Sequence, residues 1–177
     1  ARAREWESWG LEVAPACLEH LRLHLPWANI YEADAAGFQP PQAQFDLITL
    51  WHVLEHLIDP LAALTALRGA LKPGGLLVAE MPNLGGLRTR IRKRPMVNQL
   101  HLWHVSPSTF RLLLERAGWE CLALRLQDHR ARRGPLSSAL RRARIAVEQA
   151  AFRCTGQTLG SNLTAYARPL QPREHTP

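Results

Sequence analysis

The sequence predicts an α/β domain with a mainly parallel sheet and an antiparallel edge strand. Short apolar segments of strand length alternate with segments whose apolar residues recur at helical spacing. The run Phe45–Trp51 is apolar apart from Asp46, which is typical of a buried parallel strand. The last two predicted strands are joined across a helix, so they can form an antiparallel pair at the edge.

The first 44 residues are predicted to alternate between helix, strand and loop. Pro15 suits the first turn of a helix, because its fixed φ angle fits there and its missing N–H is not needed. The apolar residues after it, Cys17, Leu18, Leu21 and Leu25, follow helical spacing. The expected elements are a helix tail over Ala1–Trp6, strands over Trp9–Val13 and Asn29–Glu32, a helix over Ala16–Leu25 and a loop over Gly37–Gln44.

The middle of the chain contains the clearest boundary signals. Asp59 followed by Pro60 predicts a helix start, with Asp59 as the capping acceptor. A basic residue and a Pro-Gly-Gly turn, Lys72–Gly75, predict where this helix ends. The predicted apolar stripe of the helix is Leu61, Leu64, Leu67 and Leu71, and the strand expected after it is Leu76–Met81.

The second half continues the alternation, and we expect the whole of residues 1–177 to form one domain. Ser106-Pro107 predicts a helix start and Gly118 its end, with Phe110, Leu113, Leu114 and Ala117 facing inward. Residues 128–160 are interpreted as a basic helical insertion before the last strand. The expected segments are an irregular stretch Asn83–Gln99, a strand Trp119–Leu126, a linker Asp128–Gly134, a helix Leu136–Cys154 and a strand Asn162–Ala167.

The composition excludes two classes of protein. With 46% hydrophobic and 21% charged residues, the chain is not an intrinsically disordered one. Its apolar runs are all shorter than the roughly 18 residues that span a bilayer. Three cysteines without a CxxC pair do not predict a zinc site or a disulfide framework, and a reducing cytoplasm fits this pattern.

The positive charge lies in the second half of the chain. Residues 1–87 carry a net charge of −5 and residues 88–177 a net charge of +12. The basic run of Arg88, Arg90, Arg92, Lys93 and Arg94 would either meet an anionic substrate or be a solvated loop. The basic helix 136–154 could touch a membrane surface, although we favour a covering role, and nucleic acid binding is the least favoured interpretation.

Acidic residues follow two of the predicted strands. Ligands of open parallel sheets bind beyond the carboxyl ends of the strands. A carboxylate there, such as Glu12, can accept hydrogen bonds from two ribose hydroxyls, and Asp34 after the next strand can accept from an adenine amino group. The residues alone leave the alternative open that Glu12 only caps the helix that follows it.

Four segments in order resemble the class I S-adenosylmethionine-dependent methyltransferases, including the ubiquinone-biosynthesis O-methyltransferase branch. They are FDLITLWHVLEH (Phe45–His56), LKPGGLL (Leu71–Leu77), Met81-Pro82-Asn83 and HLWHVSPSTFRLLLERAG (His101–Gly118). The resemblance implies a Rossmann-like sheet and S-adenosylmethionine as cofactor. It also implies methyl transfer to a small-molecule acceptor, at oxygen rather than at nitrogen or carbon.

The resemblance also assigns roles to single residues. Glu12 matches the acidic residue that holds the ribose, and Asp34 the one near the adenine. Trp51 and His52 match the strand end that lines the methionine part of the cofactor. His101 and His104 fall in the segment that borders the acceptor, where either imidazole could act as general base or could simply anchor the loop.

One family feature is missing from the sequence. The family begins with a strand and a GxGxG-type loop, and no such motif is present. We therefore expect a domain incomplete at its N-terminus, which by itself binds the cofactor poorly. The alternative to an enzyme is a non-catalytic remnant of a methyltransferase domain that has lost cofactor binding.

The residues His52, Glu55 and His56 match the HxxEH pattern of some zinc peptidases. That pattern needs a helix, and the early Asp59-Pro60 leaves room for a single turn. Some ubiquinone-type relatives bind a divalent cation through an acidic-x-x-Glu-His arrangement, but here the first position is His52. We therefore favour local hydrogen bonds between the backbone and the side chains of Glu55 and His56, and no metal site.

Overall fold

The computed structural model of the chain describes residues 5–34, 38–39, 42–84, 100–127, 143, 146–147, 150 and 162–170. It contains two compact units, Ala1–Gln39 and Pro40–Pro177, and each is described here by itself. The basic run between Arg88 and Arg94 and the linker Asp128–Gly134 lie outside the described residues.

Most of the predicted helix Leu136–Cys154 also lies outside the described residues. Its four described positions, Ala143, Ala146, Val147 and Ala150, are helical and exposed. The sequence spacing puts Ala143, Val147 and Ala150 on one helical face, and that face is exposed at these three positions.

The first unit is a two-stranded parallel sheet with one helix. Strand β1 (Trp9–Glu12) pairs in parallel with β2 (Asn29–Glu32), and α1 (Pro15–His24) connects them. The strands and the helix confirm the sequence prediction, and Pro15 stands in the first turn of α1. The predicted helix tail is wrong at its last two residues, because Glu5 has a φ of 55° and Trp6 is not helical.

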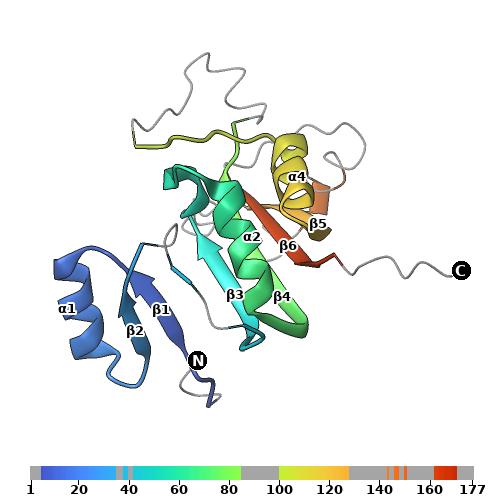
Figure 1. Ribbon diagram of the computed structural model, residues 1–177. Helices are drawn as coiled ribbons and strands as arrows, with labels where there is room; N and C mark the ends of the chain where they lie inside the picture. Colours follow the sequence, from blue (N-terminus) through green and yellow to red (C-terminus); the bar gives the residue numbers. More distant parts are fainter. Residues whose placement is uncertain are drawn as a thin grey trace, which may run out of the picture. The chain divides into compact units, whose positions relative to one another are not determined.

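The second unit is a four-stranded sheet in the order β3-β4-β6-β5 (Figure 1). Its strands are β3 (Phe45–Trp51), β4 (Leu71–Pro82), β5 (Trp119–Gln127) and β6 (Asn162–Pro169). Strands β3 and β4 are parallel, whereas β6 runs antiparallel to both β4 and β5. The predicted antiparallel pairing is therefore confirmed. The reversed strand is β6, which lies one place inside the edge formed by β5.

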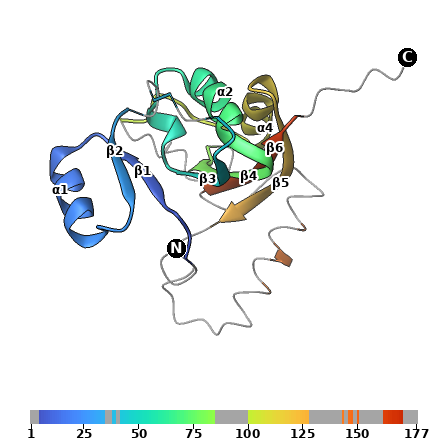
Figure 2. The ribbon, with the colours of Figure 1, turned by 60° about the horizontal axis from the view of Figure 1, so that its bottom comes forward.

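Two helices cover one face of this sheet (Figure 2). They are α2 (Pro60–Ala70) and α4 (Pro107–Arg116), and a single 3-10 turn, η2 (Leu54–His56), follows β3. Asp59 accepts a hydrogen bond from the Ala62 backbone N–H at 2.9 Å, as expected for the cap of α2. Ser106 and Thr109 form a reciprocal capping box at the start of α4.

Strand β3 is less buried than the sequence predicts. Only Leu50 is buried in it, and both Leu47 and Trp51 are exposed. Among the described residues β3 pairs only with β4, so it forms an edge of its sheet. The prediction of a fully buried strand fits β4 instead, in which Leu77 to Met81 are all buried.

The apolar stripe of α2 also differs from the prediction. Leu61 is 41% exposed, and the buried residues are Pro60, Ala63, Leu64 and Ala70. Strand β4 begins at Leu71 rather than after the glycines, with an irregularity in its pairing to β3 at this end. Lys72 does not end the helix as predicted; its ammonium group lies 2.8 Å from the carboxylate of Asp46.

The core of the second unit lies between the two helices and the sheet. Trp119 is fully buried, and its indole N–H donates to the backbone carbonyl of Leu64 at 3.0 Å. This bond ties the start of β5 to α2. Among the described residues, no helix is both long and apolar enough to cross a membrane.

Candidate functional site

The candidate site lies at the carboxyl ends of β3 and β4, the edge where open parallel sheets bind ligands. His52 follows β3 directly and has a φ of 55°, in the left-handed region that non-glycine residues rarely adopt. Its backbone N–H donates to the carbonyl of Glu80 on β4 at 3.1 Å. This bond holds the unusual backbone conformation against the sheet, and backbone strain of this kind occurs often at functional sites.

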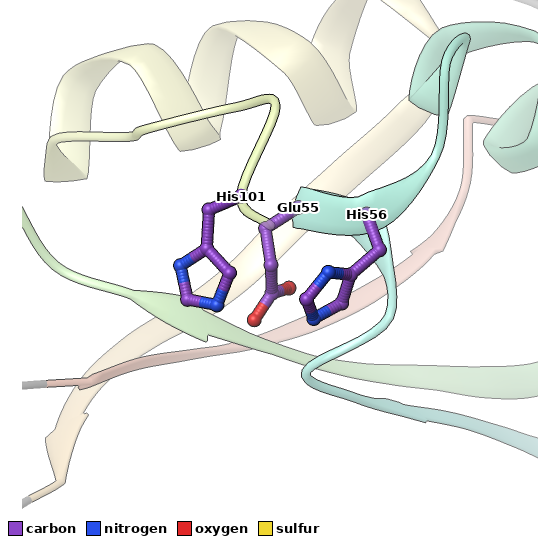
Figure 3. A group of neighbouring side chains, drawn as sticks. All are labelled: Glu55, His56 and His101. Atoms are coloured by element: carbon purple, nitrogen blue, oxygen red, sulfur yellow. The ribbon is translucent and has the colours of Figure 1, made fainter. Parts of the chain in front are cut away.

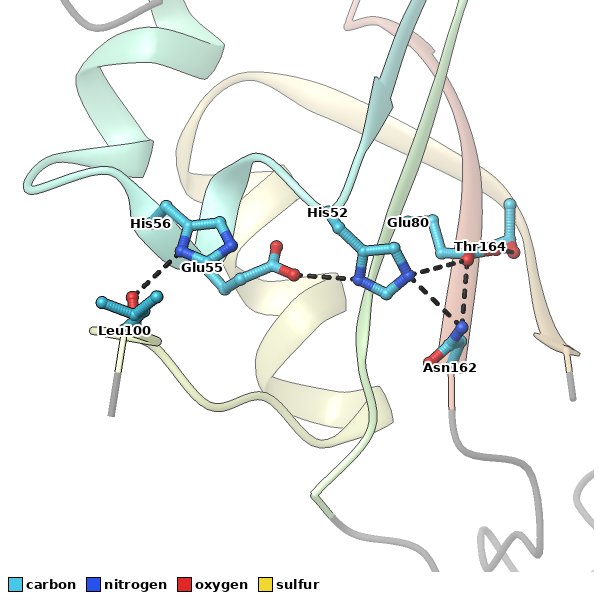
Figure 4. Close-up of polar contacts among 7 residues, drawn as sticks. All are labelled: His52, Glu55, His56, Glu80, Leu100, Asn162 and Thr164. Atoms are coloured by element: carbon cyan, nitrogen blue, oxygen red, sulfur yellow. Dashed lines mark hydrogen bonds and ion pairs between the residues drawn. The ribbon is translucent and has the colours of Figure 1, made fainter. Parts of the chain in front are cut away.

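The imidazole of His52 lies between two buried carboxylates (Figure 4). Its Nδ1 is 2.9 Å from Oε1 of Glu55, and its Nε2 is 3.2 Å from Oε1 of Glu80. Glu80 also accepts from the Thr164 hydroxyl at 2.7 Å and from the Asn162 amide at 3.1 Å. Both ring nitrogens are therefore engaged, and the imidazole is held in one orientation by β4, β6 and the η2 turn.

A second group of side chains adjoins this network. Ligand-capable atoms of Glu55, His56 and His101 lie within 4.8 Å of one another (Figure 3). Glu55 is fully buried, and its Oε2 has no hydrogen-bond partner among the described residues. His56 donates from Nδ1 to the Leu100 carbonyl at 2.9 Å. These three residues could hold a metal ion.

The hydrogen bonds of Glu55 and His56 only partly match those expected. His56 does bond to backbone, but to Leu100, which is distant in sequence, and the Glu55 side chain bonds to His52 instead of to backbone. The backbone carbonyl of Glu55 accepts from Leu102 at 2.8 Å and from Trp103 at 3.2 Å.

The histidines of the acceptor segment lie in the same region. The ring centroid of His101 is 4.8 Å from that of His56 and 6.2 Å from that of His104. Burial lowers the pKa of His101, an effect that the negative charge of Glu55 opposes. Nε2 of His104 is shielded from solvent and has no hydrogen-bond partner among the described residues.

This loop is anchored by other residues than its histidines. The indole N–H of Trp103 donates to the Leu57 carbonyl at 2.8 Å, and Val105 bridges to Asn83. These contacts hold the loop beside the η2 turn and the end of β4.

The two acidic candidates of the first unit lie at the ends of neighbouring strands, Glu12 as the last residue of β1. Oε1 of Glu12 accepts from the backbone N–H groups of Val13 at 2.8 Å and Ala14 at 2.9 Å, just before α1. These two bonds lower the pKa of Glu12, which stays ionised at neutral pH. Asp34 lies two residues beyond β2, and its side chain is exposed. Glu12 does not cap α1, because no side chain caps the N-cap residue Ala14. It stabilises the turn before the helix instead, and it does so with one of its two carboxylate oxygens.

Sequence reasoning missed Glu80, Asn162 and Thr164. Glu80 is the one acidic residue in an otherwise apolar strand segment, and that isolation was an available signal. Asn162 and Thr164 stand opposite the end of β4 only through the antiparallel pairing with β6. Of the predicted residues, His52 joins the Glu80 network and His101 joins the Glu55 group, while Trp51 is the exposed last residue of β3.

Comparison with known proteins decides the family. Residues 1–124 match the family described as the methyltransferase domain. The chain belongs to this family. Methyltransferase structures share its α/β fold, and the cofactor of the family is S-adenosylmethionine.

Two curated relatives are similar to parts of this methyltransferase domain. A trans-aconitate 2-methyltransferase from Methylobacterium radiotolerans is 42% identical over 83 residues, which are 47% of this chain and 32% of the relative. A ubiquinone biosynthesis O-methyltransferase from Dinoroseobacter shibae is 34% identical over 127 residues, which are 63% of this chain and 50% of the relative. The matches thus span about a third to a half of the relatives' own lengths.

A solved structure supports the fold of the methyltransferase domain. The crystal structure of a SAM-dependent methyltransferase from Archaeoglobus fulgidus superimposes with a TM-score of 0.63 at 18% identity. The superposition covers 94% of this chain and 77% of that one. At this identity the likeness speaks for the fold alone.

Proposed function

We propose that this domain transfers a methyl group from S-adenosylmethionine to an oxygen atom of a small-molecule acceptor. The observation that carries the proposal is the placement of His101 and His104 beside the ends of β3 and β4 in a member of the methyltransferase domain family. The similarity to a ubiquinone biosynthesis O-methyltransferase supports oxygen as the acceptor atom.

In this proposal the cofactor is bound by residues at strand ends. Glu12 accepts hydrogen bonds from the ribose hydroxyls, and Asp34 lies near the adenine. Trp51 and His52 line the methionine part. The carboxylates of Glu55 and Glu80 contact the two ring nitrogens of His52 and keep the ring in place. When bound, the cofactor supplies an electrophilic methyl group on a positively charged sulfur.

His104 acts on the acceptor. Its imidazole accepts the hydrogen bond of the acceptor hydroxyl and takes the proton as the new oxygen–carbon bond forms and the sulfur–carbon bond breaks. The sulfonium charge is lost with the methyl group, so the products are a methyl ether or ester, a neutral thioether and a protonated imidazole. His101 lies beside this group and, being kept neutral by its lowered pKa, does not compete for the positive charge.

The test is the variant His104→Gln, after an acceptor has been found by screening small molecules with methyl-labelled cofactor. Loss of a general base lowers turnover by about 10²–10⁴, while the affinity for the cofactor stays unchanged. His20→Gln, on the exposed surface of α1, is the matched control and should retain full activity.

Two results would contradict the proposal. Full activity of His104→Gln across the pH range would leave His104 as an anchor, with alignment of the reactants carrying the catalysis. Absence of cofactor binding by the unsubstituted full-length protein would instead support the alternative of a non-catalytic remnant.

A further inference from the structure

We propose that Glu55, His56 and His101 form a binding site for a divalent transition-metal cation such as Zn²⁺. The ligands are one carboxylate oxygen and two imidazole nitrogens, all within 4.8 Å of one another (Figure 3). The ligand atoms of a tetrahedral zinc ion stand about 3.4 Å apart. Side-chain rotations that move the ligand atoms by about an ångström therefore complete the site. Metal binding here does not depend on the proposed methyl transfer.

The state of the Glu55 carboxylate points independently to a cation. The side chain is fully buried, and its Oε2 has no hydrogen-bond partner among the described residues. A buried carboxylate oxygen without a partner costs free energy that a bound cation removes. His52 holds Oε1 at 2.9 Å, and Figure 3 shows the carboxylate between the rings of His56 and His101.

The hydrogen bond of His56 prepares it as a ligand. Its Nδ1 donates to the carbonyl of Leu100 at 2.9 Å, which leaves the lone pair of the neutral ring on Nε2. Metal-binding histidines usually donate their second ring nitrogen to a carbonyl or carboxylate in this way. His56 is exposed, so a cation can reach the group from solvent.

The donor set also selects the class of metal. Two imidazoles and one carboxylate suit Zn²⁺ and its neighbours, whereas Mg²⁺ prefers oxygen ligands. The acidic-x-x-Glu-His arrangement for a hard cation does not fit, because His52 stands in place of the acidic residue. Both of its nitrogens are engaged by Glu55 and Glu80. His101 supplies the third ligand instead, from a distant segment.

The test is titration calorimetry of Zn²⁺ into protein freed of metal with a chelator. We expect one tight site per chain, and an at least tenfold loss of affinity in His101→Asn and in Glu55→Gln. Circular dichroism verifies that each variant is folded. Should Glu55→Gln fail to fold, His101→Asn decides, because its position lies in a loop.

A matched control addresses the other close histidine pair of the described residues. The rings of His20 and His24 stack on the surface of α1 with their centroids 4.0 Å apart. Two histidines four residues apart on a helix can also bind a metal. His24→Asn should leave the tight site intact. Substitution with Co²⁺ should give the visible absorption of a tetrahedral nitrogen and oxygen site, without the near-ultraviolet charge transfer of a thiolate ligand.

Four outcomes would overturn the proposal. They are no tight Zn²⁺ site, unchanged affinity in His101→Asn, loss of the site in His24→Asn, and a thiolate band with Co²⁺. Displacement of Zn²⁺ by Mg²⁺ at a comparable concentration would overturn the choice of a transition metal.

Discussion

Nε2 of His52 lies 3.2 Å from Oε1 of Glu80, which joins the residue after β3 to a carboxylate buried within the sheet. The β6 residues Asn162 and Thr164 donate to the same carboxylate. Three strands therefore meet at one side chain. The Glu80 carboxylate fixes the edge of the sheet at which the candidate site lies.

Replacing Glu80 by Gln should destabilise the second unit. The amide keeps the size of the side chain but loses the charge. Its NH2 group replaces one of the two oxygens that contact His52, Asn162 and Thr164. We expect the free energy of unfolding to fall by about 1–3 kcal/mol, as measured by urea denaturation.

The matched control for this variant is Glu120→Gln. Glu120 pairs with Arg168 at 2.7 Å on the surface of the same sheet. An exposed pair of this kind contributes about 0–1 kcal/mol. Equal losses in the two variants would mean that the buried network adds no stability of its own.

Gly118 should be the position where an added methyl group is most damaging to the start of β5. Its φ is +81°, and a Cβ there would contact the guanidinium of Arg68. We expect Gly118→Ala to cost about 1–2 kcal/mol of unfolding free energy, because the left-handed conformation is unfavourable for L residues.

Gly69→Ala is the matched control, since a Cβ there meets nothing within 4 Å and the residue lies in α2. It should stabilise the protein by about 0.5–1 kcal/mol, because glycine weakens a helix. The same substitution is thus expected to have opposite signs at two positions. A destabilised Gly69→Ala would contradict the assignment of the last turn of α2.

Local signals were sufficient to predict most elements of the fold. Asp59 and Ser106 are side-chain caps, Gly118 is a left-handed stop, and each acts over a few residues that the sequence displays directly. The exposure of β3 could not be predicted in this way. An apolar run indicates that a strand is suited to burial. Whether that strand lies at the edge of a sheet depends on pairing between distant segments.

The candidate site was predictable only in part, for the same reason. The family resemblance pointed to His52, His101 and His104, because their motifs can be recognised in the sequence itself. The contact of Glu55 with His101 requires the chain to return from a distant loop, and the role of Glu80 depends on β6 lying beside β4. Sequence spacing carries no signal for such juxtapositions.

Acid should weaken the first unit through Glu12. Its folded pKa lies below the ordinary value of 4.5, because Val13 and Ala14 donate hydrogen bonds to the ionised carboxylate. The stabilisation is therefore present above the unfolded pKa and is lost as the pH falls through the folded pKa. We expect the free energy of unfolding of the unsubstituted protein to fall as the pH is lowered below about 4.5. In Glu12→Gln the same drop in pH should cause a smaller fall. An identical acid dependence in both proteins would show that these bonds add no stability.

The proposed role of Glu12 at the ribose predicts a second, separate effect. Glu12→Ala should weaken the binding of S-adenosylmethionine by about 2 kcal/mol, roughly thirtyfold, because charged hydrogen bonds to hydroxyls are lost. Titration calorimetry at neutral pH measures this affinity. Thermal denaturation of the same variant measures the cost of losing the bonds to Val13 and Ala14.

The control for the binding effect is Glu32→Ala. Glu32 is the residue paired with Glu12 across β1 and β2, and its carboxylate lies 3.7 Å from Arg22 on the surface. Because the family resemblance assigns no cofactor role to Glu32 and its carboxylate pairs with Arg22, its loss should leave the cofactor affinity unchanged. Equal affinity in Glu12→Ala and the unsubstituted protein would remove Glu12 from the cofactor site. Its carboxylate would then serve only the turn that leads into α1.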